Sequence, residues 1–301
     1  MNLQKFINER LHINSNTKLV IQLRPSTRDE LRDLIEQELE RQGPNADLNH
    51  IDTSKIKDMS ELFYKLDVVN IKINDWDVSN VENMYGMFHA CSNFNCDLSN
   101  WNVSNVENMF AAFNGCATFT GNGLENWNVS NVENMSNMFY GCKDFNVDLS
   151  NWDVSKVNDM NSMFVMDKSF EGKGLENWDV SNVENMHDMF EYCDKFNADL
   201  SDWNVSKVTN MQRMFNFCNE FNSDLSRWNV SNVENMESMF QHCSNFNSDL
   251  SNWDTSNVTN MEYMFYGCNK FKADLSGWNV SKVPISRAFK LKSGAPKFGR
   301  L

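Results

Sequence analysis

The residues of this chain with the most chemical potential are its eight cysteines, which could bind metal, form disulfides or act as nucleophiles. Seven recur at intervals of 25, 26 or 51 residues, at positions 91, 116, 142, 193, 218, 243 and 268, and Asp167 stands inside the longest interval. No Cys-x-x-Cys pair or histidine cluster accompanies them, as a zinc site would require. We therefore interpret the series as a core column of free thiols, which suits a reducing compartment.

Carboxylates and thioethers follow the same period. Stacked carboxylates could hold a cation such as calcium, but no Asp-x-Asp-x-Asp loop is present. We favour aspartates that accept backbone amides of their own turns; they are Asp97, Asp148, Asp199, Asp224, Asp249 and Asp274. Sixteen methionines recur in phase with phenylalanine and tryptophan, which indicates core packing rather than a copper site.

Catalytic motifs are missing from the sequence. It has no phosphate-cradling glycine loop, no nucleophile elbow and no pair of histidines with metal-ligand spacing. His12 and His50 are isolated, and we interpret both as ordinary surface or capping residues. We therefore predict that the chain is not an enzyme and that it needs no cofactor and no metal.

The element that positions these columns is a repeat marked by nine tryptophans, at 76, 101, 127, 152, 178, 203, 228, 253 and 278. With tryptophan as position 0, the apolar places are Leu −3, Val +2 and +5, Met +8 and +11, Phe +12, Cys +15 and Phe +18. A period of this length predicts a solenoid. Leu-x-x-Trp-x-Val predicts one short parallel strand per rung, and the spacing from +5 to +15 predicts a helical or 3₁₀ segment. Ser at +3 with Glu at +6 predicts a capping box.

The ends of the chain depart from the period. Ile51 takes the tryptophan place in a degenerate first rung, and Pro284 interrupts the rung of Trp278, which gives about ten rungs. Residues 1–49 predict a strand at 18–23 and a helix from Ser26 or Thr27 to Gly43, together an N-terminal cap. We assign 50–283 to the solenoid and 284–301, a basic stretch, to a closing cap or a tail.

Composition limits the partners. A net charge of −14 opposes binding to nucleic acid, and no apolar run is long enough to insert into a membrane. The N-terminus shows no apolar signal-peptide core, so the sequence by itself predicts a cytoplasmic protein. We expect a monomer.

The copy from Phe246 to Met261 resembles the 25/26-residue repeat of BspA-like bacterial surface proteins, a branch of the leucine-rich-repeat class. The resemblance covers about 46–283. It implies an α/β repeat solenoid, right-handed and leucine-rich-repeat-like, with one parallel strand and one helical or 3₁₀ segment per rung and an N-terminal β-α cap. It also implies adhesion or host-protein binding at a bacterial surface or after secretion. The chain departs from that type because it shows no signal peptide and no wall-anchoring tail.

Positions +9, +10, +13 and +14 vary between the copies, whereas the positions beside the tryptophan barely change. A constant frame with variable aromatic and arginine side chains is typical of binding surfaces. We predict that these positions bind a partner protein through Tyr85, Phe110, Tyr140, His187, Tyr192, Arg213, Phe217, His242, Tyr263 and Tyr266. The alternative is a solvent-facing strip under weak constraint. The predicted function is an adhesive scaffold; the alternative is an intracellular adaptor or exported effector.

Overall fold

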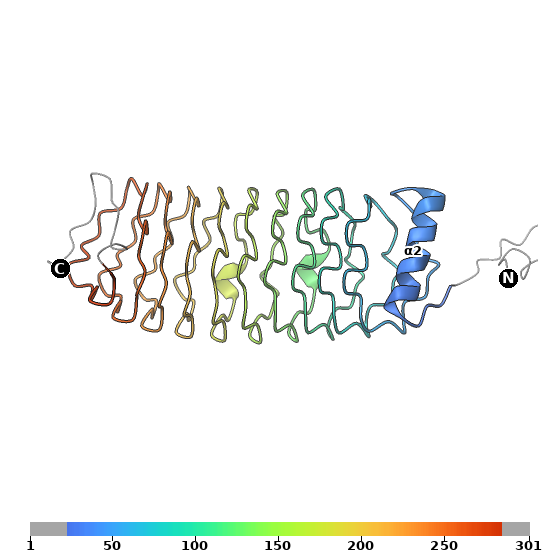
Figure 1. Cartoon of the computed structure of the whole chain (residues 1–301), viewed down its shortest axis with the longest axis horizontal. Coiled ribbons are helices and arrows are strands. Elements are labelled where there is room, and N and C mark those ends of the chain that lie inside the picture. The colour runs from blue at the N-terminus through green and yellow to red at the C-terminus, as the bar shows by residue number, and fades with distance from the viewer. Residues whose placement is uncertain (1–22, 285–301) are drawn as a thin grey trace, which may run out of the picture.

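The computed structural model describes residues 23–284 as a long stack of rungs with one helix across its N-terminal end (Figure 1). The helix is α2 (Arg28–Gln42); Thr27 accepts the Glu30 amide as its N-cap, and Gly43 is its C-cap. These ends confirm the predicted helix. The other helices of residues 23–284 are the 3₁₀ turns η1 (Leu124–Asn126) and η2 (Leu175–Asn177), which lie in the two 26-residue rungs that replace Asp with Gly-x-Gly.

The strand predicted for Leu-x-x-Trp-x-Val is wrong. In each such segment the chain turns, as where the Trp101 amide donates to the Leu98 carbonyl at 3.1 Å. Asp97 tightens that corner because its Oδ1 accepts the Ser99 amide at 2.9 Å. A segment closed by two such bonds cannot stay extended. Isolated parallel bridges form instead at +7, in one column from residue 58 to residue 260.

From +8 to +14, the N–H groups join neighbouring rungs through a main-chain ladder that runs in one direction, opposite to the bond from the +6 amide to the +6 carbonyl of the preceding rung. The N–H groups at +8, +10, +12 and +14 donate to the carbonyls at +7, +9, +11 and +13 of the next rung. All four bonds recur between every neighbouring pair from the Ile51 rung to the Trp253 rung, at 2.6–3.2 Å. Along this ladder, the inter-rung donors therefore face the C-terminal end and the acceptors face the N-terminal end.

The helical segment predicted between +5 and +15 is also wrong. The N–H groups at +11, +13 and +15 donate to the carbonyls at +8, +10 and +12 of the same rung, and these bonds close three overlapping turns. The residues at +10 and +14 have φ between +52° and +82° in each of these nine rungs, a left-handed conformation that a right-handed helix excludes. The predicted capping box does not form at Ser79, since its hydroxyl donates to Asp77 Oδ1 at 2.6 Å.

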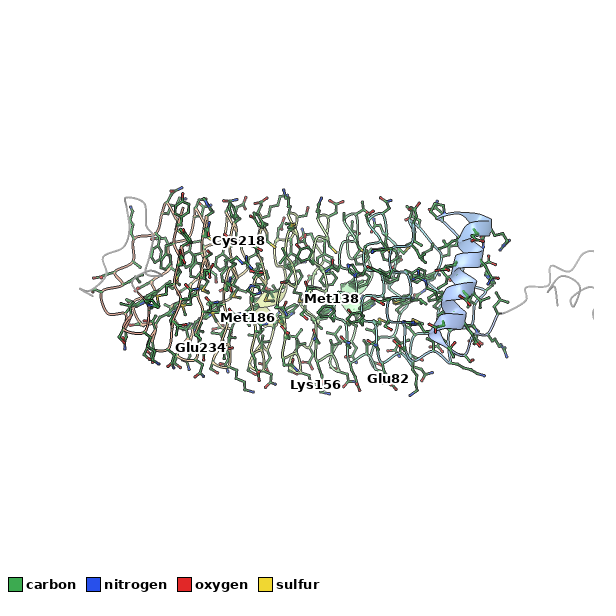
Figure 2. All side chains as sticks on the ribbon, in the orientation of Figure 1. Glu82, Met138, Lys156, Met186, Cys218 and Glu234 are labelled. Carbon is green, nitrogen blue, oxygen red and sulfur yellow. The ribbon has the colours of Figure 1, made fainter. Side chains whose placement is uncertain are left out.

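Side-chain columns fill the centre of the stack. Every tryptophan is buried, and its indole Nε1 donates to the −3 carbonyl of the preceding rung at 2.8–3.2 Å. The aspartates at −4 each accept the amide two residues later, as predicted. Figure 2 shows Glu82, Lys156 and Glu234 along one long edge and Cys218 towards the other, with Met138 and Met186 between them. The +6 to +15 segment thus crosses the width of the solenoid.

The cysteine column is part of this core. All seven thiols donate to the +12 carbonyl of the preceding rung at 2.8–3.1 Å. Asp167 takes the same place in the Trp152 rung and is fully buried, with no hydrogen-bond partner for either carboxyl oxygen among the described residues. Burial raises the pKa of Asp167 well above its usual value, and the nearby amides of Ser169 and Phe170 only oppose that rise. Burial therefore favours the protonated form of this carboxyl in the folded protein.

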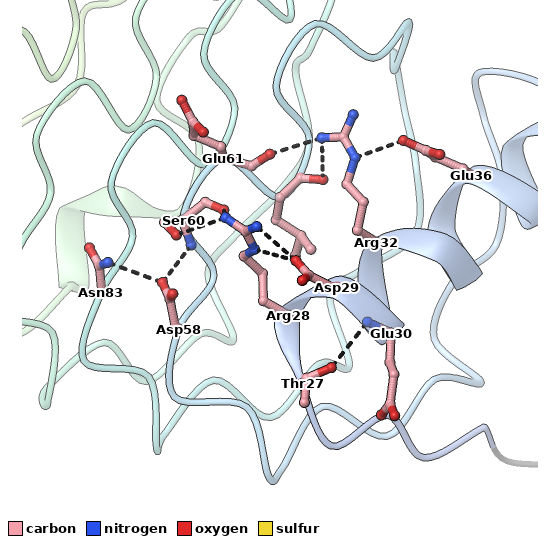
Figure 3. Close-up of polar contacts among 11 residues, drawn as sticks. Thr27, Arg28, Asp29, Glu30, Arg32, Glu36, Asp58, Ser60, Glu61 and Asn83 are labelled. Atoms are coloured by element: carbon pink, nitrogen blue, oxygen red, sulfur yellow. Dashed lines mark hydrogen bonds and ion pairs between the residues drawn. The ribbon is translucent and has the colours of Figure 1, made fainter.

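The N-terminal end of the ladder is covered by two arginines of α2 (Figure 3). Arg32 donates to the carbonyls of Leu62 at 3.0 Å and Tyr64 at 3.3 Å, and Arg28 donates to that of Ser60 at 3.4 Å. These are the carbonyls at +9, +11 and +13, which have no preceding rung to donate to them. Cations at a row of aligned carbonyls are favourable, as at the C-terminus of a helix. The helix half of the predicted cap is therefore present.

Two other predictions concern the ends of the chain. The predicted strand at 18–23 lies outside the described residues except for Leu23, which pairs in parallel with Ile51. Segment 284–301 lies outside them except for Pro284. In the described part of the chain, no helix is both long enough and apolar enough to span a bilayer.

Candidate partner-binding surface

The ten predicted binding residues all lie in the ladder segment. Since the rungs stack in register, positions +9, +10, +13 and +14 become four columns parallel to the long axis, which we call the variable strip. Tyr85 is 38% exposed, and the other nine are half-buried. Half-buried side chains can present a contact surface while their packing holds them in place, which suits a preformed binding face.

The structure gathers five of the ten into one aromatic cluster in the C-terminal half of the strip. The rings of Tyr192 and Phe217 stack at 4.6 Å, and those of Phe217 and His242 stack at 4.4 Å. Tyr266 meets His242 edge-on at 5.3 Å, and Tyr263 meets Tyr266 edge-on at 6.1 Å. We call Tyr192, Phe217, His242 and Tyr266 the aromatic ladder. Sequence spacing placed Tyr192, Phe217 and His242 one period apart, but it did not show that they are in contact.

The N-terminal half of the strip holds a separate, smaller pair. Tyr85 and Phe110 stack at 5.1 Å in the +9 column. Tyr140 has no ring contact among the described residues, so it belongs to neither group. Tyr64 and His89 also lie close, with ring centres 5.0 Å apart in the +13 column. They stand at variable positions but were outside the predicted set.

A polar cluster adjoins the aromatic ladder. Arg213 forms a two-point pair with Asp188, in which Nε lies 2.8 Å from Oδ1 and Nη2 lies 3.0 Å from Oδ2. Its Nη2 also lies 3.1 Å from Nε2 of His187. Asn216 donates to Glu191 at 2.8 Å. The structure thus brings Arg213 and His187 together, and it adds Asp188, Glu191 and Asn216, which sequence reasoning missed. Asp188 and Arg213 are 25 residues apart in the sequence, one repeat period, and this spacing could have indicated that they meet between neighbouring rungs.

Burial sets the charge states in this cluster. It raises the pKa of Asp188, while the hydrogen bonds from Arg213 oppose that rise. It raises the pKa of Glu191, where the Asn216 amide opposes it. Burial, together with the charge of Arg213, lowers the pKa of His187, so the imidazole is neutral at pH 7. A neutral His187 can accept the Arg213 N–H.

The +14 column shows where side chains have been kept against a conformational cost. Tyr192, Phe217 and His242 have φ of 62°, 62° and 61°. The same place holds glycine in three other rungs, at 115, 141 and 267. A left-handed conformation costs a residue with a Cβ roughly 1–2 kcal/mol, and such strain gathers at functional sites. Three consecutive aromatics therefore occupy a position where glycine is the low-energy choice.

The two halves of the strip differ in charge. In the rungs of Trp178 to Trp253, the strip carries four carboxylates and one guanidinium, a net charge of −3. In the rungs of Ile51 to Trp152 it carries only Glu61 and Lys65, which cancel. The half with the aromatic ladder is therefore the acidic half. Within the described residues, no group of three or more His, Cys, Asp or Glu side chains could hold a metal ion.

Comparisons with known proteins give a family but no activity. Residues 33–145, 109–217 and 199–298 each match the family described as "Mycoplasma protein of unknown function, DUF285". No curated protein matches the chain. Among solved structures, one similar chain comes from "Crystal structure of TLR13-ssRNA13 complex", at 10% identity and a TM-score of 0.22. That match covers 77% of this chain and 46% of the other, so this chain spans less than half the length of that relative.

Proposed function

The chain belongs to the family described as Mycoplasma protein of unknown function, DUF285, and we propose that it is a non-enzymatic scaffold that binds a partner protein through the aromatic ladder. The observation that carries this proposal is the strained +14 column. Tyr192, Phe217 and His242 hold left-handed conformations in a fold that accepts glycine at the same place. Packing of the core cannot account for them, because all three are half-buried on the surface.

Physical properties of the ladder favour a protein as its ligand. Stacked rings are rigid, so their ordering on binding costs little entropy, and aromatic residues with arginine dominate the energetics of protein interfaces. Arg213 is held by Asp188 beside these rings. The strip therefore offers apolar edges with fixed polar groups at their side, a combination that resembles the centre of a protein interface more than a small-molecule pocket.

The binding proposal is tested with the triple variant Tyr192→Ser, Phe217→Ser and His242→Ser. Partners would be captured from native cells by photo-crosslinking to intact protein and identified by mass spectrometry. We expect one or more proteins captured by the wild type to be lost with the triple variant. Tyr140→Ser is the matched control, because it removes a half-buried strip aromatic that lies apart from the ladder. Equal capture by all three proteins would contradict the proposal.

We further propose that the scaffold works at a bacterial surface in adhesion, as the resemblance to BspA-like repeats implies. The buried free thiol column favours the alternative, an intracellular adaptor or exported effector, because free thiols persist in reducing compartments. Protease shaving of intact cells distinguishes the two. Loss of the protein on shaving supports adhesion, whereas full protection in the cytosolic fraction supports the adaptor.

A further inference from the structure

Three polar atoms of the variable strip meet in a triangle whose contacts cannot all be favourable at once. Nη2 of Arg213 lies 3.0 Å from Oδ2 of Asp188 and 3.1 Å from Nε2 of His187. The third side, from Nε2 of His187 to Oδ2 of Asp188, is also 3.1 Å. While the imidazole is neutral, Nη2 can donate to both neighbours, which leaves two acceptors in contact. A proton on Nε2 turns that contact into a hydrogen bond and sets two donors, Nε2 and Nη2, against each other.

Arg213 has a second carboxylate within reach when it loses Asp188. Its Nε lies 3.9 Å from Oε1 of Glu191, the oxygen that accepts Nδ2 of Asn216 at 2.8 Å. Oδ1 of Asn216 is buried and has no hydrogen-bond partner among the described residues. The bond to Glu191 is therefore the contact that holds the Asn216 amide, and a guanidinium that turned towards Glu191 would compete for the same oxygen.

The polar cluster and the aromatic ladder share main chain. Glu191 directly precedes Tyr192, and Asn216 directly precedes Phe217. The rings of Tyr192 and Phe217 stack at 4.6 Å, and the Tyr192 N–H donates to the Asn216 carbonyl at 2.8 Å. A change in the bond between Glu191 and Asn216 therefore acts on the same two backbone segments that place this ring pair.

We propose that a proton on His187 draws Asp188 away from Arg213 and thereby makes partner binding by the aromatic ladder sensitive to pH. The inference rests on the proposed function and adds the regulation of that site. The proton comes from solvent and binds at Nε2, which then donates to Oδ2 of Asp188. Arg213 turns towards Glu191, and the amide of Asn216 loses its acceptor. Two arrangements of one cluster, selected by one proton, form a two-state element of the kind that histidine switches use.

Charged groups surround His187 from four rungs of the stack. In order along the chain they are Asp159, Asp188, Glu191, Arg213 and Glu237. Burial, together with the charge of Arg213, lowers the pKa of His187, so the switch acts below the ordinary imidazole value of about 6.5. Burial raises the pKa of Asp188 and of Glu191, so these carboxylates also take up protons in acid. A variant without the imidazole is therefore needed to isolate its contribution.

The test follows the intact protein by NMR from pH 7.5 to pH 4.5, with labelled histidine and asparagine. We expect the side-chain amide signal of Asn216 to shift with the midpoint of the His187 titration. This step should be absent from His187→Gln, which keeps an acceptor oxygen for Arg213 but cannot gain the proton. His89→Gln is the matched control, because His89 is another half-buried imidazole of the strip whose pKa is lowered by burial. The step should persist there.

The wild-type titration alone can overturn the inference. An Asn216 signal that does not respond at the His187 midpoint would show that the proton does not reach the Glu191 bond. This outcome requires no partner and no folded variant, so it leaves the proposed function intact.

A second measurement connects the switch to binding. The probe is a peptide from a random 12-residue display library, selected on the wild type at pH 7.5. We expect its affinity to fall severalfold from pH 7.5 to pH 5.0 for the wild type and for His89→Gln, and clearly less for His187→Gln. Any titration of His242 is common to all three proteins. Equal pH dependence with and without His187 would overturn the regulatory role.

The aromatic variant Tyr192→Ser/Phe217→Ser/His242→Ser separates the two proposals. A peptide that binds this variant as well as the wild type would contradict the proposed function. The NMR titration would still decide whether the proton on His187 moves the cluster. A peptide that requires the rings and yet binds equally at both pH values would contradict the switch alone.

Discussion

The rungs of Trp76 to Trp152 and the rungs of Trp178 to Trp253 have the same backbone and different surfaces. Both halves use the same four ladder bonds per rung, the same indole hydrogen bonds and the same two left-handed positions. At position +14 the first half holds alanine, glycine or methionine, while the second half holds tyrosine, phenylalanine, histidine and glycine. The ladder uses main-chain atoms only, so its geometry does not depend on these side chains. Side chains on this surface can therefore change while the main-chain ladder stays the same.

The largest expected effect tests whether the two halves have equivalent cores. Trp101→Ala and Trp203→Ala each remove a buried indole and its hydrogen bond to the preceding rung. We expect each to cost about 3–5 kcal/mol in the local opening free energy, with values that agree between the halves. Amide hydrogen exchange of the flanking rungs measures this. A clear difference between the two sites would mean that the cores are not equivalent.

The junction of the halves holds a predicted weak point at Asp167. Asp167→Cys restores the thiol column and should stabilise the neighbouring rungs by roughly 1–3 kcal/mol at pH 7, because it removes an unpartnered buried polar group. Burial raises the pKa of Asp167 in the folded state above its value in the unfolded chain. The folded protein therefore binds an extra proton, and wild-type stability falls as pH rises above about 4.

The pH dependence supplies the control for that prediction. Below pH 4 the carboxyl is protonated in both states, so the advantage of Asp167→Cys should shrink to its packing contribution. It should grow as pH rises from 4 to 7. Asp167→Asn, which is neutral but equally large, should show the same trend. Denaturation curves at several pH values measure both variants, and a pH-independent gain would show that Asp167 is ionised in the fold.

The cap should affect only the first half. Arg32→Ala removes the donors to the Leu62 and Tyr64 carbonyls, and net hydrogen bonds are worth about 1 kcal/mol each. We expect a loss of roughly 1–2 kcal/mol in the opening free energy of the Ile51 and Trp76 rungs, with the Trp228 rung unchanged. Hydrogen exchange resolves the two regions. Arg32→Lys keeps the charge but lacks the planar fork, so it should recover only part of the loss.

The smallest expected change in stability comes from the aromatic ladder. In Phe217→Gly, relief of the left-handed strain favours the variant, whereas lost stacking and the flexibility of glycine oppose it. These terms nearly cancel, so we expect a net change below about 1 kcal/mol. Binding of a ladder-dependent partner should nevertheless fall at least tenfold. A large loss of stability would show that the ladder supports the fold.

The core of the solenoid could be predicted because the columns of Trp, Val, Met, Phe and Cys recur in phase, and α2 because Thr27 and Gly43 mark its ends. The local backbone could not. Apolar residues three apart fit helices, yet here they stand at the two ends of single turns, as Leu98 and Trp101 do. The aspartate or asparagine corners, two or three in each rung, carried the better signal, and repeated turns of that kind exclude both strand and helix.

The variable strip was predictable in position but not in detail. Variation between copies located its four columns. Left-handed backbone at Tyr192 or Arg213 could not be foreseen, because neither residue type favours φ > 0. The pairing of Arg213 with Asp188 depends on exact register between rungs, which only the stacked structure supplies.

The single direction of the main-chain ladder also gives the protein an order of assembly in time. A chain made from its N-terminus completes α2 and the Ile51 rung before any later rung exists, and it emerges at only about 5–20 residues per second. Each finished rung then turns a row of N–H groups toward the segment still being synthesised. At that pace a new rung of 25 residues arrives about every 1–5 seconds and meets a prepared template instead of another loose segment. Translation and folding therefore advance along this molecule in the same direction.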